Sequence, residues 1–317
     1  MNIIYSDAHN LHQPQFERYD GKDVPYAETA ARVDSIVQAL QAHDFEPLQE
    51  PEVFSISHIL AIHNKNYVDF LKKKSAAVPE DQQIYPSDFI TDSYAPVTKG
   101  TFQASVAAVN TALTGAKQIA AGEPVVYSLC RPPGHHAAHH SMGGYCYFNN
   151  AAIAAHYLSH YGSVAILDID YHHGNGTQEA FYERADVLYV SLHADPNTNY
   201  PYTTGFADEN GRGSGKGYNI NIPLPKTTDT ESYSTVLRGA IKEIENFQPR
   251  FLVLSAGFDT YVNDPIGGLH LTKGAYRRIG RHIRDMNLPT LIIQEGGYNI
   301  ADLGGLVSDL LDSFRPA

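Results

Sequence analysis

The sequence has few cysteines, a deficit of basic residues and no long apolar segment. Two cysteines are too few for the disulfide framework of a small secreted protein. The 23 lysine and arginine residues face 35 aspartate and glutamate residues, and the net charge of -12 argues against a nucleic-acid partner. The start, MNIIYSDAHN, lacks the basic and apolar regions of a signal peptide, and no segment is long enough to span a bilayer. We therefore expect a cytoplasmic protein without a membrane partner.

Short apolar runs alternate with helical patterns along the 317 residues. Continuous apolar runs typical of strands buried on both faces of a parallel sheet cover residues 2–5, 125–129, 164–169, 187–192, 251–256 and 289–294. Helical periodicity covers residues 29–43, 101–121, 149–160, 231–246 and 272–286. This order predicts a three-layer α/β/α fold with a mostly parallel central sheet. Without an internal repeat or linker, residues 1–317 are expected to form a single domain, with long loops at 10–28, 76–98 and 195–217.

Polar groups follow four of the six predicted strands. The sequences that come next are CRPPGHH, DYHHGNG, GFD and EGGY. Because sites in open parallel sheets form outside the carboxyl ends of the strands, we expect these groups to meet at one edge. Several titratable groups are costly to bury there unless they are paired or bound to a metal.

A metal site is the simplest explanation of the carboxylates in LDIDYHHGNG. Asp168, Asp170 and His172 recur at every second position, so an extended chain directs all three to one side. Asp170 and His172 together with Asp259 would supply three protein ligands, which is the arrangement of a catalytic zinc site with an open position. Mixed oxygen and nitrogen ligands also suit ferrous iron or manganese. The alternative is that Asp168 and His172 only cap the next helix and bond to loop backbone.

Three further residues have side chains suited to amide hydrolysis. His135 and His136 are adjacent, so we expect them to have different partners, and histidine serves as general base or acid near neutral pH. Tyr298 follows two glycines, which leave room for its hydroxyl to reach a developing oxyanion. The alternatives are that one histidine is a buried hydrogen-bonding residue and that Tyr298 only packs.

Six motifs together resemble one family over nearly the whole chain. The motifs are RPPGHHA, GGYCYFNNAAIAA, LDIDYHHGNGTQEAFY, SLHADP, AGFD and EGGY. In this order they resemble the arginase/deacetylase-fold zinc deacetylases, the histone deacetylase superfamily. The stretches YSDAHNLH, FYERADVLYVSLHADP and DPI are similar to its bacterial acetylpolyamine amidohydrolases in particular.

The resemblance implies roles for individual residues. It implies that Asp170, His172 and Asp259 bind zinc, one ion per chain. It implies that His136, beside His135, is the general base and acid, with Tyr298 polarising the acetyl carbonyl. Behind the two histidines it places Asp168 and Asn175, respectively.

The resemblance also implies structural potassium and a substrate channel. A first potassium site would use Asp168, Asp170, His172, Ser191 and Leu192. A second would lie near Phe181, Arg184, Val187 and Tyr218. The channel residues would be Gly144, Tyr145, Tyr200, Ile266, Tyr94 and Asp92. Arg32 matches an arginine near an internal cavity of the family.

The sequence indicates the deacetylation reaction more clearly than the substrate. Residues 76–98 are shorter than the matching insertion of dimeric acetylpolyamine amidohydrolases, and Ile266 replaces the gatekeeper glutamate of the eukaryotic polyamine deacetylase. Acetylpolyamines are the first hypothesis and protein acetyl-lysine the second. The third is a catalytically silent acyl-lysine-binding module. For a polyamine, we expect exposed rim carboxylates such as Asp92, Glu17 or Asp20 to attract the cationic end. Association into a homo-oligomer stays open.

Overall fold

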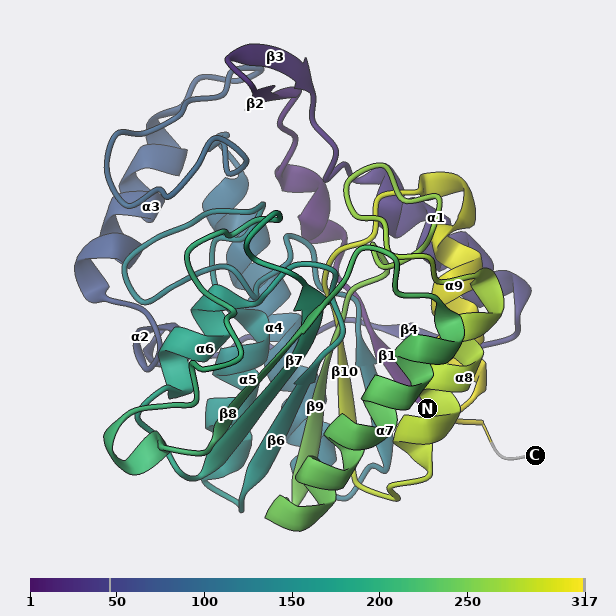
Figure 1. The fold of residues 1–317 in the computed structure, drawn as a ribbon. Coiled ribbons are helices and arrows are strands. Elements are labelled where there is room, and N and C mark those ends of the chain that lie inside the picture. Colours follow the sequence, from purple (N-terminus) through teal and green to yellow (C-terminus); the bar gives the residue numbers. More distant parts are fainter. Residues whose placement is uncertain (46, 316–317) are drawn as a thin grey trace.

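A computed structural model describes residues 1–45 and 47–315. Its central sheet has eight parallel strands in the order β4-β1-β5-β10-β9-β6-β7-β8 (Figure 1). These strands are β1 (Asn2–Ile4), β4 (Leu48–Gln49), β5 (Val125–Ser128), β6 (Val164–Asp168), β7 (Val187–Ala194), β8 (Asn219–Leu224), β9 (Phe251–Ala256) and β10 (Thr290–Gln294). A separate antiparallel hairpin pairs β2 (Phe16–Tyr19) with β3 (Lys22–Pro25) and stands away from the sheet.

Helices cover both faces of the sheet, as predicted. One face carries α1 (Ala31–Ala42), α7 (Thr230–Phe247), α8 (Lys273–Arg284) and α9 (Ile300–Asp312). The other carries α2 (Ser57–Leu60), α3 (Lys65–Ala77), α4 (Thr101–Ala120), α5 (Asn150–Ser159) and α6 (Asn175–Phe181). Short 3-10 turns lie at η1 (Asp7–Leu11) and η2 (Gly213–Gly215). The two apolar clusters on either side of the sheet form the core.

The strand order explains how distant motifs meet. All residues of β6, β9 and β10 are buried, as their continuous apolar sequences predict. The four strands that precede the polar motifs, β5, β10, β9 and β6, are consecutive neighbours in the middle of the sheet. Because these four strands run parallel, the polar loops that follow them all begin at the same edge of the sheet.

The predicted regular structure was incomplete, since it lacks helices α6 and α9 and strand β4. Residues 10–28, predicted as a loop, contain the β2–β3 hairpin, which turns at Asp20 and Gly21, both with positive φ. The predicted strands also omit β8, an edge strand in which asparagine and isoleucine alternate, because its sequence is not a continuous apolar run. Among the described residues no helix has the length and apolarity required to cross a membrane. Cys130 and Cys146 are buried free thiols.

Candidate active site

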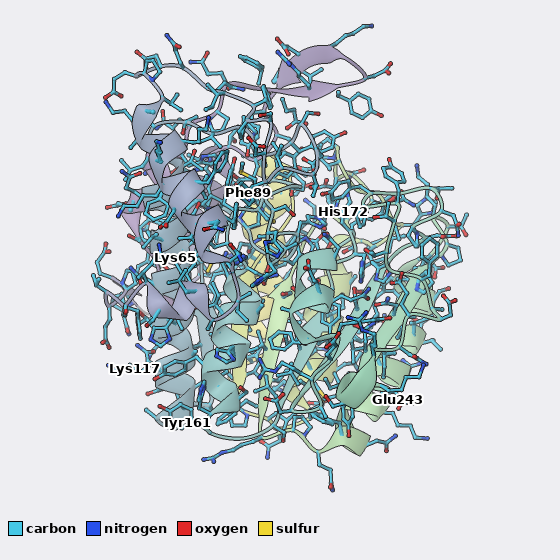
Figure 2. All side chains as sticks on the ribbon, turned by 90° about the vertical axis from the view of Figure 1, so that its left-hand side faces the viewer. Lys65, Phe89, Lys117, Tyr161, His172 and Glu243 are labelled. Carbon is cyan, nitrogen blue, oxygen red and sulfur yellow. The ribbon has the colours of Figure 1, made fainter. Side chains whose placement is uncertain are left out.

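Asp170, His172 and Asp259 converge at the carboxyl edge of the sheet. Nδ1 of His172 lies 3.3 Å from Oδ1 of Asp170 and 3.0 Å from Oδ2 of Asp259. One potential ligand atom of each residue lies within 4.8 Å of the others. Figure 2 shows His172 a little above the middle of the molecule, whereas Tyr161 and Glu243 lie in its lower part. The three groups are therefore spaced as ligands of one metal ion.

The charges of this triad suit a cation. Burial and, to a smaller extent, the negative charge of Asp170 raise the pKa of Asp259 to about 7. Burial opposes ionisation of Asp170 too, but the positive charge of His135 and the hydrogen bond from His172 outweigh it, so the Asp170 pKa is lowered. Burial lowers the pKa of His172, yet its two carboxylate partners raise it to about 9. Without a metal, a proton on His172 holds the carboxylates together; a divalent cation can take its place.

Two glycines make room for the carboxylates. A Cβ atom on Gly257 would lie 2.1 Å from Oδ2 of Asp170, and one on Gly296 would lie 2.6 Å from the same oxygen. The backbone can therefore approach closely enough for the N–H of Gly296 to donate to Asp170 at 2.9 Å. The N–H of Tyr171 donates to Oδ1 of Asp259 at 2.9 Å. These bonds fix both carboxylates toward His172.

His135 and His136 have different partners, although their ring centres are only 4.0 Å apart. Nδ1 of His135 lies 3.2 Å from Oδ2 of Asp168, whose Oδ1 accepts from the N–H of Asp170 at 3.2 Å. Burial lowers the His135 pKa, but the charges of Asp170 and Asp168 raise it to about 10. Nδ1 of His136 lies 2.8 Å from Oδ1 of Asn175, while burial and the positive charges of His135 and His172 hold its pKa well below the usual range. His136 is thus a neutral imidazole at neutral pH.

Tyr298 lines the same pocket as His136 and His172, and neighbouring residues hold it in place. The guanidinium carbon of Arg32 lies 4.8 Å from the centre of the Tyr298 ring. Nε of Arg32 donates to the carbonyl of Gly297 at 2.6 Å. Within residues 1–45 and 47–315, no group accepts a hydrogen bond from the Tyr298 hydroxyl. The hydroxyl therefore remains available to a substrate oxygen.

A narrow channel leads to the triad. Its volume is about 320 Å³, and tyrosines dominate its walls. The ring centres of Tyr145 and Tyr298 are 5.4 Å apart, and those of His136 and Tyr200 are 4.8 Å apart. The lining comprises Glu17, Tyr19, Tyr94, His136, Gly144, Tyr145, Tyr171, His172, Thr198, Asn199, Tyr200, Tyr202, Pro265, Ile266 and Tyr298. An extended methylene chain fits such aromatic walls.

The predicted rim carboxylates do not form an exposed set. Asp92 does not line the channel: its carboxylate accepts hydrogen bonds from Tyr200, Gly144 and Tyr94 behind the wall. Asp20 is at the exposed hairpin tip, away from the lining. Glu17 does line the channel, but its side chain is buried, with 4% exposure, because strand β2 turns it inward. Glu17 was expected to be exposed at the rim and is instead buried. Asp92 was expected to line the channel and instead lies behind its wall.

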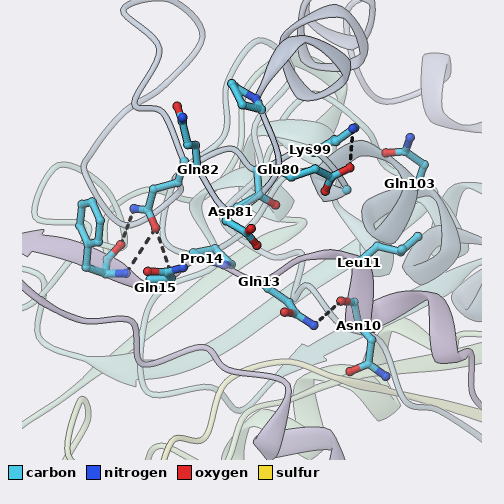
Figure 3. Close-up of a pocket in the computed structure, with 15 residues that line it drawn as sticks. Asn10, Leu11, Gln13, Pro14, Gln15, Glu80, Asp81, Gln82, Lys99 and Gln103 are labelled. Atoms are coloured by element: carbon cyan, nitrogen blue, oxygen red, sulfur yellow. Dashed lines mark hydrogen bonds and ion pairs between the residues drawn. The ribbon is translucent and has the colours of Figure 1, made fainter.

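A larger cavity than this channel lies outside the site. It measures about 820 Å³ and runs between the segment before the hairpin and the loop after α3 (Figure 3). Amide side chains dominate its lining, and its acidic Glu80 is paired with Lys99. None of the triad residues reaches it. The volume of a cavity therefore does not by itself identify the active site.

Comparison with known proteins identifies the family. The model of the histone deacetylase domain matches residues 26–314. The chain belongs to the histone deacetylase family. Acetylpolyamine amidohydrolase 2 of Pseudomonas aeruginosa is 40% identical over 99% of each chain, and the acetylpolyamine amidohydrolase of Mycoplana ramosa is 35% identical over 98% of each. The crystal structure of an acetylpolyamine aminohydrolase from Burkholderia pseudomallei superimposes with a TM-score of 0.94, at 38% identity, over 99% of this chain and 98% of that one.

Membership of the histone deacetylase family makes the chain a deacetylase, a hydrolase of amide bonds. The residues of the two potassium sites implied by this family lie at different positions along β7. Asp168, at the end of β6, pairs in register with Ser191, and Leu192 follows it. At the start of β7, Val187 lies near the turn in which the N–H of Arg184 donates to the carbonyl of Phe181 at 3.0 Å. The carbonyl of Tyr218 accepts from Tyr189 at 2.9 Å. Both sites stay predictions.

Two buried carboxylates at the site have no counterpart among the predicted site residues. Glu295 accepts hydrogen bonds from the N–H groups of Gly134 and His135, at 2.7 and 3.2 Å. Asp264 accepts from the N–H of Tyr298 at 2.6 Å. Both stand in motifs that mark the family, EGGY and DPI, and an Asp-Pro pair is a common turn former. These contacts join loops far apart in sequence, which periodicity does not reveal.

Proposed function

We propose that this deacetylase is zinc-dependent and releases acetate from acetylated polyamines. Asp170, His172 and Asp259 would hold the zinc ion, since their oxygen and nitrogen donors suit zinc and leave a position open. When bound, the ion lowers the pKa of the attacking water and polarises the acetyl carbonyl. Structural potassium at the two sites beside β7 completes the proposal; oxygen donors around the fully buried Asp168 support the first of them.

The proton transfers fall to His136. Since Nδ1 of His136 is bonded to the amide oxygen of Asn175, its proton is on Nδ1 and Nε2 is the acceptor. Nε2 takes a proton from the attacking water and later returns it to the leaving amine. Tyr298 donates its hydroxyl proton in a hydrogen bond to the oxygen on which negative charge develops. His135, paired with Asp168, keeps a positive charge beside the carboxylates.

The observation that carries the polyamine assignment is the position of Glu17. Its Oε1 accepts from the hydroxyl of Tyr145 at 3.0 Å and its Oε2 from the N–H of Ala27 at 3.3 Å. Each carboxylate oxygen has capacity for a second donor. A buried carboxylate in an aromatic channel favours a chain that carries an ammonium group, because burying either charge alone is unfavourable. The relatives named acetylpolyamine amidohydrolases agree with this chemistry.

The test is a substrate panel with a charge-removing variant. We expect Glu17→Gln to lower kcat/KM for acetylputrescine and acetylspermidine by roughly 10- to 100-fold, the effect of one hydrogen bond to a charged group. A neutral acetylated amine of equal length should be affected little, because glutamine retains an acceptor for Tyr145. Asp20→Asn, at the exposed hairpin tip, is the matched control. Equal losses on neutral and cationic substrates, or a wild-type preference for an acetyl-lysine peptide, would overturn the polyamine assignment.

A further inference from the structure

The loop between β9 and α8 contains a buried carboxylate with four backbone partners. Oδ2 of Asp264 accepts from the N–H groups of Tyr298 and Asn299, at 2.6 and 3.1 Å. Oδ1 accepts from the N–H groups of Ile266 and Gly267, at 2.9 and 3.1 Å. Its side chain is 8% exposed. Charge-assisted bonds in such surroundings are about twice as strong as neutral ones, so one aspartate fastens two loops together.

The backbone before Tyr298 needs such an anchor. Gly297 has a φ of +115°, in the region that glycine alone adopts readily. Two consecutive glycines allow the following residue to take many orientations, and the Tyr298 hydroxyl bonds to no described protein group that could fix it. The direction of the side chain is therefore set by contacts to the backbone and to the ring face.

Each residue of this segment has a separate anchor. The N–H of Gly296 donates to Asp170, and the carbonyl of Gly297 accepts from Arg32. Asp264 is the group that holds the N–H of Tyr298 itself. Because Asn299 caps α9, the bond from Asn299 to Asp264 also ties the start of that helix to the same carboxylate.

The same carboxylate holds the channel wall on its other side. Ile266 lines the channel, and its N–H is bonded to Oδ1 of Asp264. Gly267 packs so closely that an added Cβ would lie 1.9 Å from the carbonyl oxygen of Asp259. The spacing between Ile266 and Tyr298, across which an acetyl group has to pass, is thus set by the two oxygens of Asp264.

We propose that Asp264 is a positioning residue that holds Tyr298 in its catalytic pose. The inference rests on the proposed function, in which Tyr298 donates to the developing oxyanion. Asp264 touches neither substrate nor metal in this account. It acts through the peptide N–H of Tyr298, so its contribution requires the hydroxyl of that tyrosine.

A double-mutant cycle tests this dependence. Asp264→Asn keeps the size of the side chain but replaces one acceptor oxygen by a donor, which cannot face the N–H groups it now meets. We expect kcat to fall at least tenfold with little change in metal content, and by no more than the roughly 100- to 1,000-fold expected for Tyr298→Phe. In the Tyr298→Phe background, Asp264→Asn should change kcat by less than about threefold, since coupled residues are not additive. Asp229→Asn, which alters the exposed cap of α7, is the matched control.

The outcomes separate this inference from the function on which it rests. An equal loss in both backgrounds, or no loss in either, overturns the role of Asp264 while leaving that of Tyr298 intact. If Tyr298→Phe alone stays within about threefold of wild type, the oxyanion role fails instead, a bound set from the range for oxyanion donors. Should Asp264→Asn fail to fold, Asp264→Ser, which keeps one acceptor oxygen, is put through the same cycle and judged by the same criterion.

Discussion

The hydroxyl of Tyr200 donates a 2.7 Å hydrogen bond to Oδ2 of Asp92. The same oxygen accepts from the N–H of Gly144 at 3.0 Å, and Oδ1 accepts from the N–H of Tyr94 at 2.8 Å. Asp92 thus joins three segments of the channel wall from behind. Its charge stabilises protein donors and is not presented to a substrate.

Because the Asp92 carboxylate is bonded to protein donors, we expect Asp92→Ala to affect cationic and neutral substrates equally. Removal of the carboxylate leaves the Tyr200 hydroxyl and the Gly144 N–H without their partner, at about 1–3 kcal/mol for each buried group. The wall should loosen, and KM should rise roughly tenfold for cationic and neutral acetylated amines alike. Steady-state kinetics on acetylputrescine and a neutral analogue of equal length check this. A loss confined to the cationic substrate would mean that Asp92 contacts the ammonium group.

For the metal site, we expect Asp259→Ala to abolish metal binding and activity together. The variant removes one of the three proposed ligand groups and also the acceptor of the Tyr171 N–H. Elemental analysis of the purified protein, beside circular dichroism to verify folding, is the measurement. Asp88→Ala, at an exposed position, should retain wild-type metal content. A folded Asp259→Ala protein with a full complement of metal would exclude Asp259 as a ligand.

Local patterns in the sequence predict the sheet and the grouping of the strand-end motifs. Val164–Asp168 reads as a buried strand, and Asp170 and His172 follow it at the spacing that lets both reach Asp259. These features depend on short-range periodicity and on the general geometry of parallel sheets. They require no knowledge of how distant loops fold.

The hairpin shows what such patterns miss. Its Asp20-Gly21 turn is a recognised hairpin signal, but the strands beside it are short and polar. In β2 the side chain of Glu17 is buried and that of Arg18 is exposed, and this reversal of the expected exposure depends on how the hairpin packs on the rest of the chain. The four bonds to Asp264 depend on loop paths that no periodicity specifies.

The pairing of His136 with an amide predicts a specific dependence on pH. In the native protein, Oδ1 of Asn175 accepts from Nδ1 of His136, and burial keeps the His136 pKa well below the usual range. A carboxylate in the same place would stabilise the imidazolium form, so Asn175→Asp should raise the His136 pKa by roughly one to three pH units. The general base must be neutral, and activity is lost as the pH falls through its pKa. The acid limb of the kcat/KM profile should therefore move to higher pH.

The control for Asn175→Asp is Asn197→Asp, which adds the same charge at an exposed position of the 195–217 loop. Its profile should match that of wild type, since a solvated charge is screened over about 10 Å at ordinary ionic strength. Profiles are to be measured with a neutral acetylated amine, so that titration of the substrate and of Glu17 does not enter. If the acid limb of Asn175→Asp stays where it is in wild type, the group that titrates there is not His136, and the assignment of His136 as the general base fails.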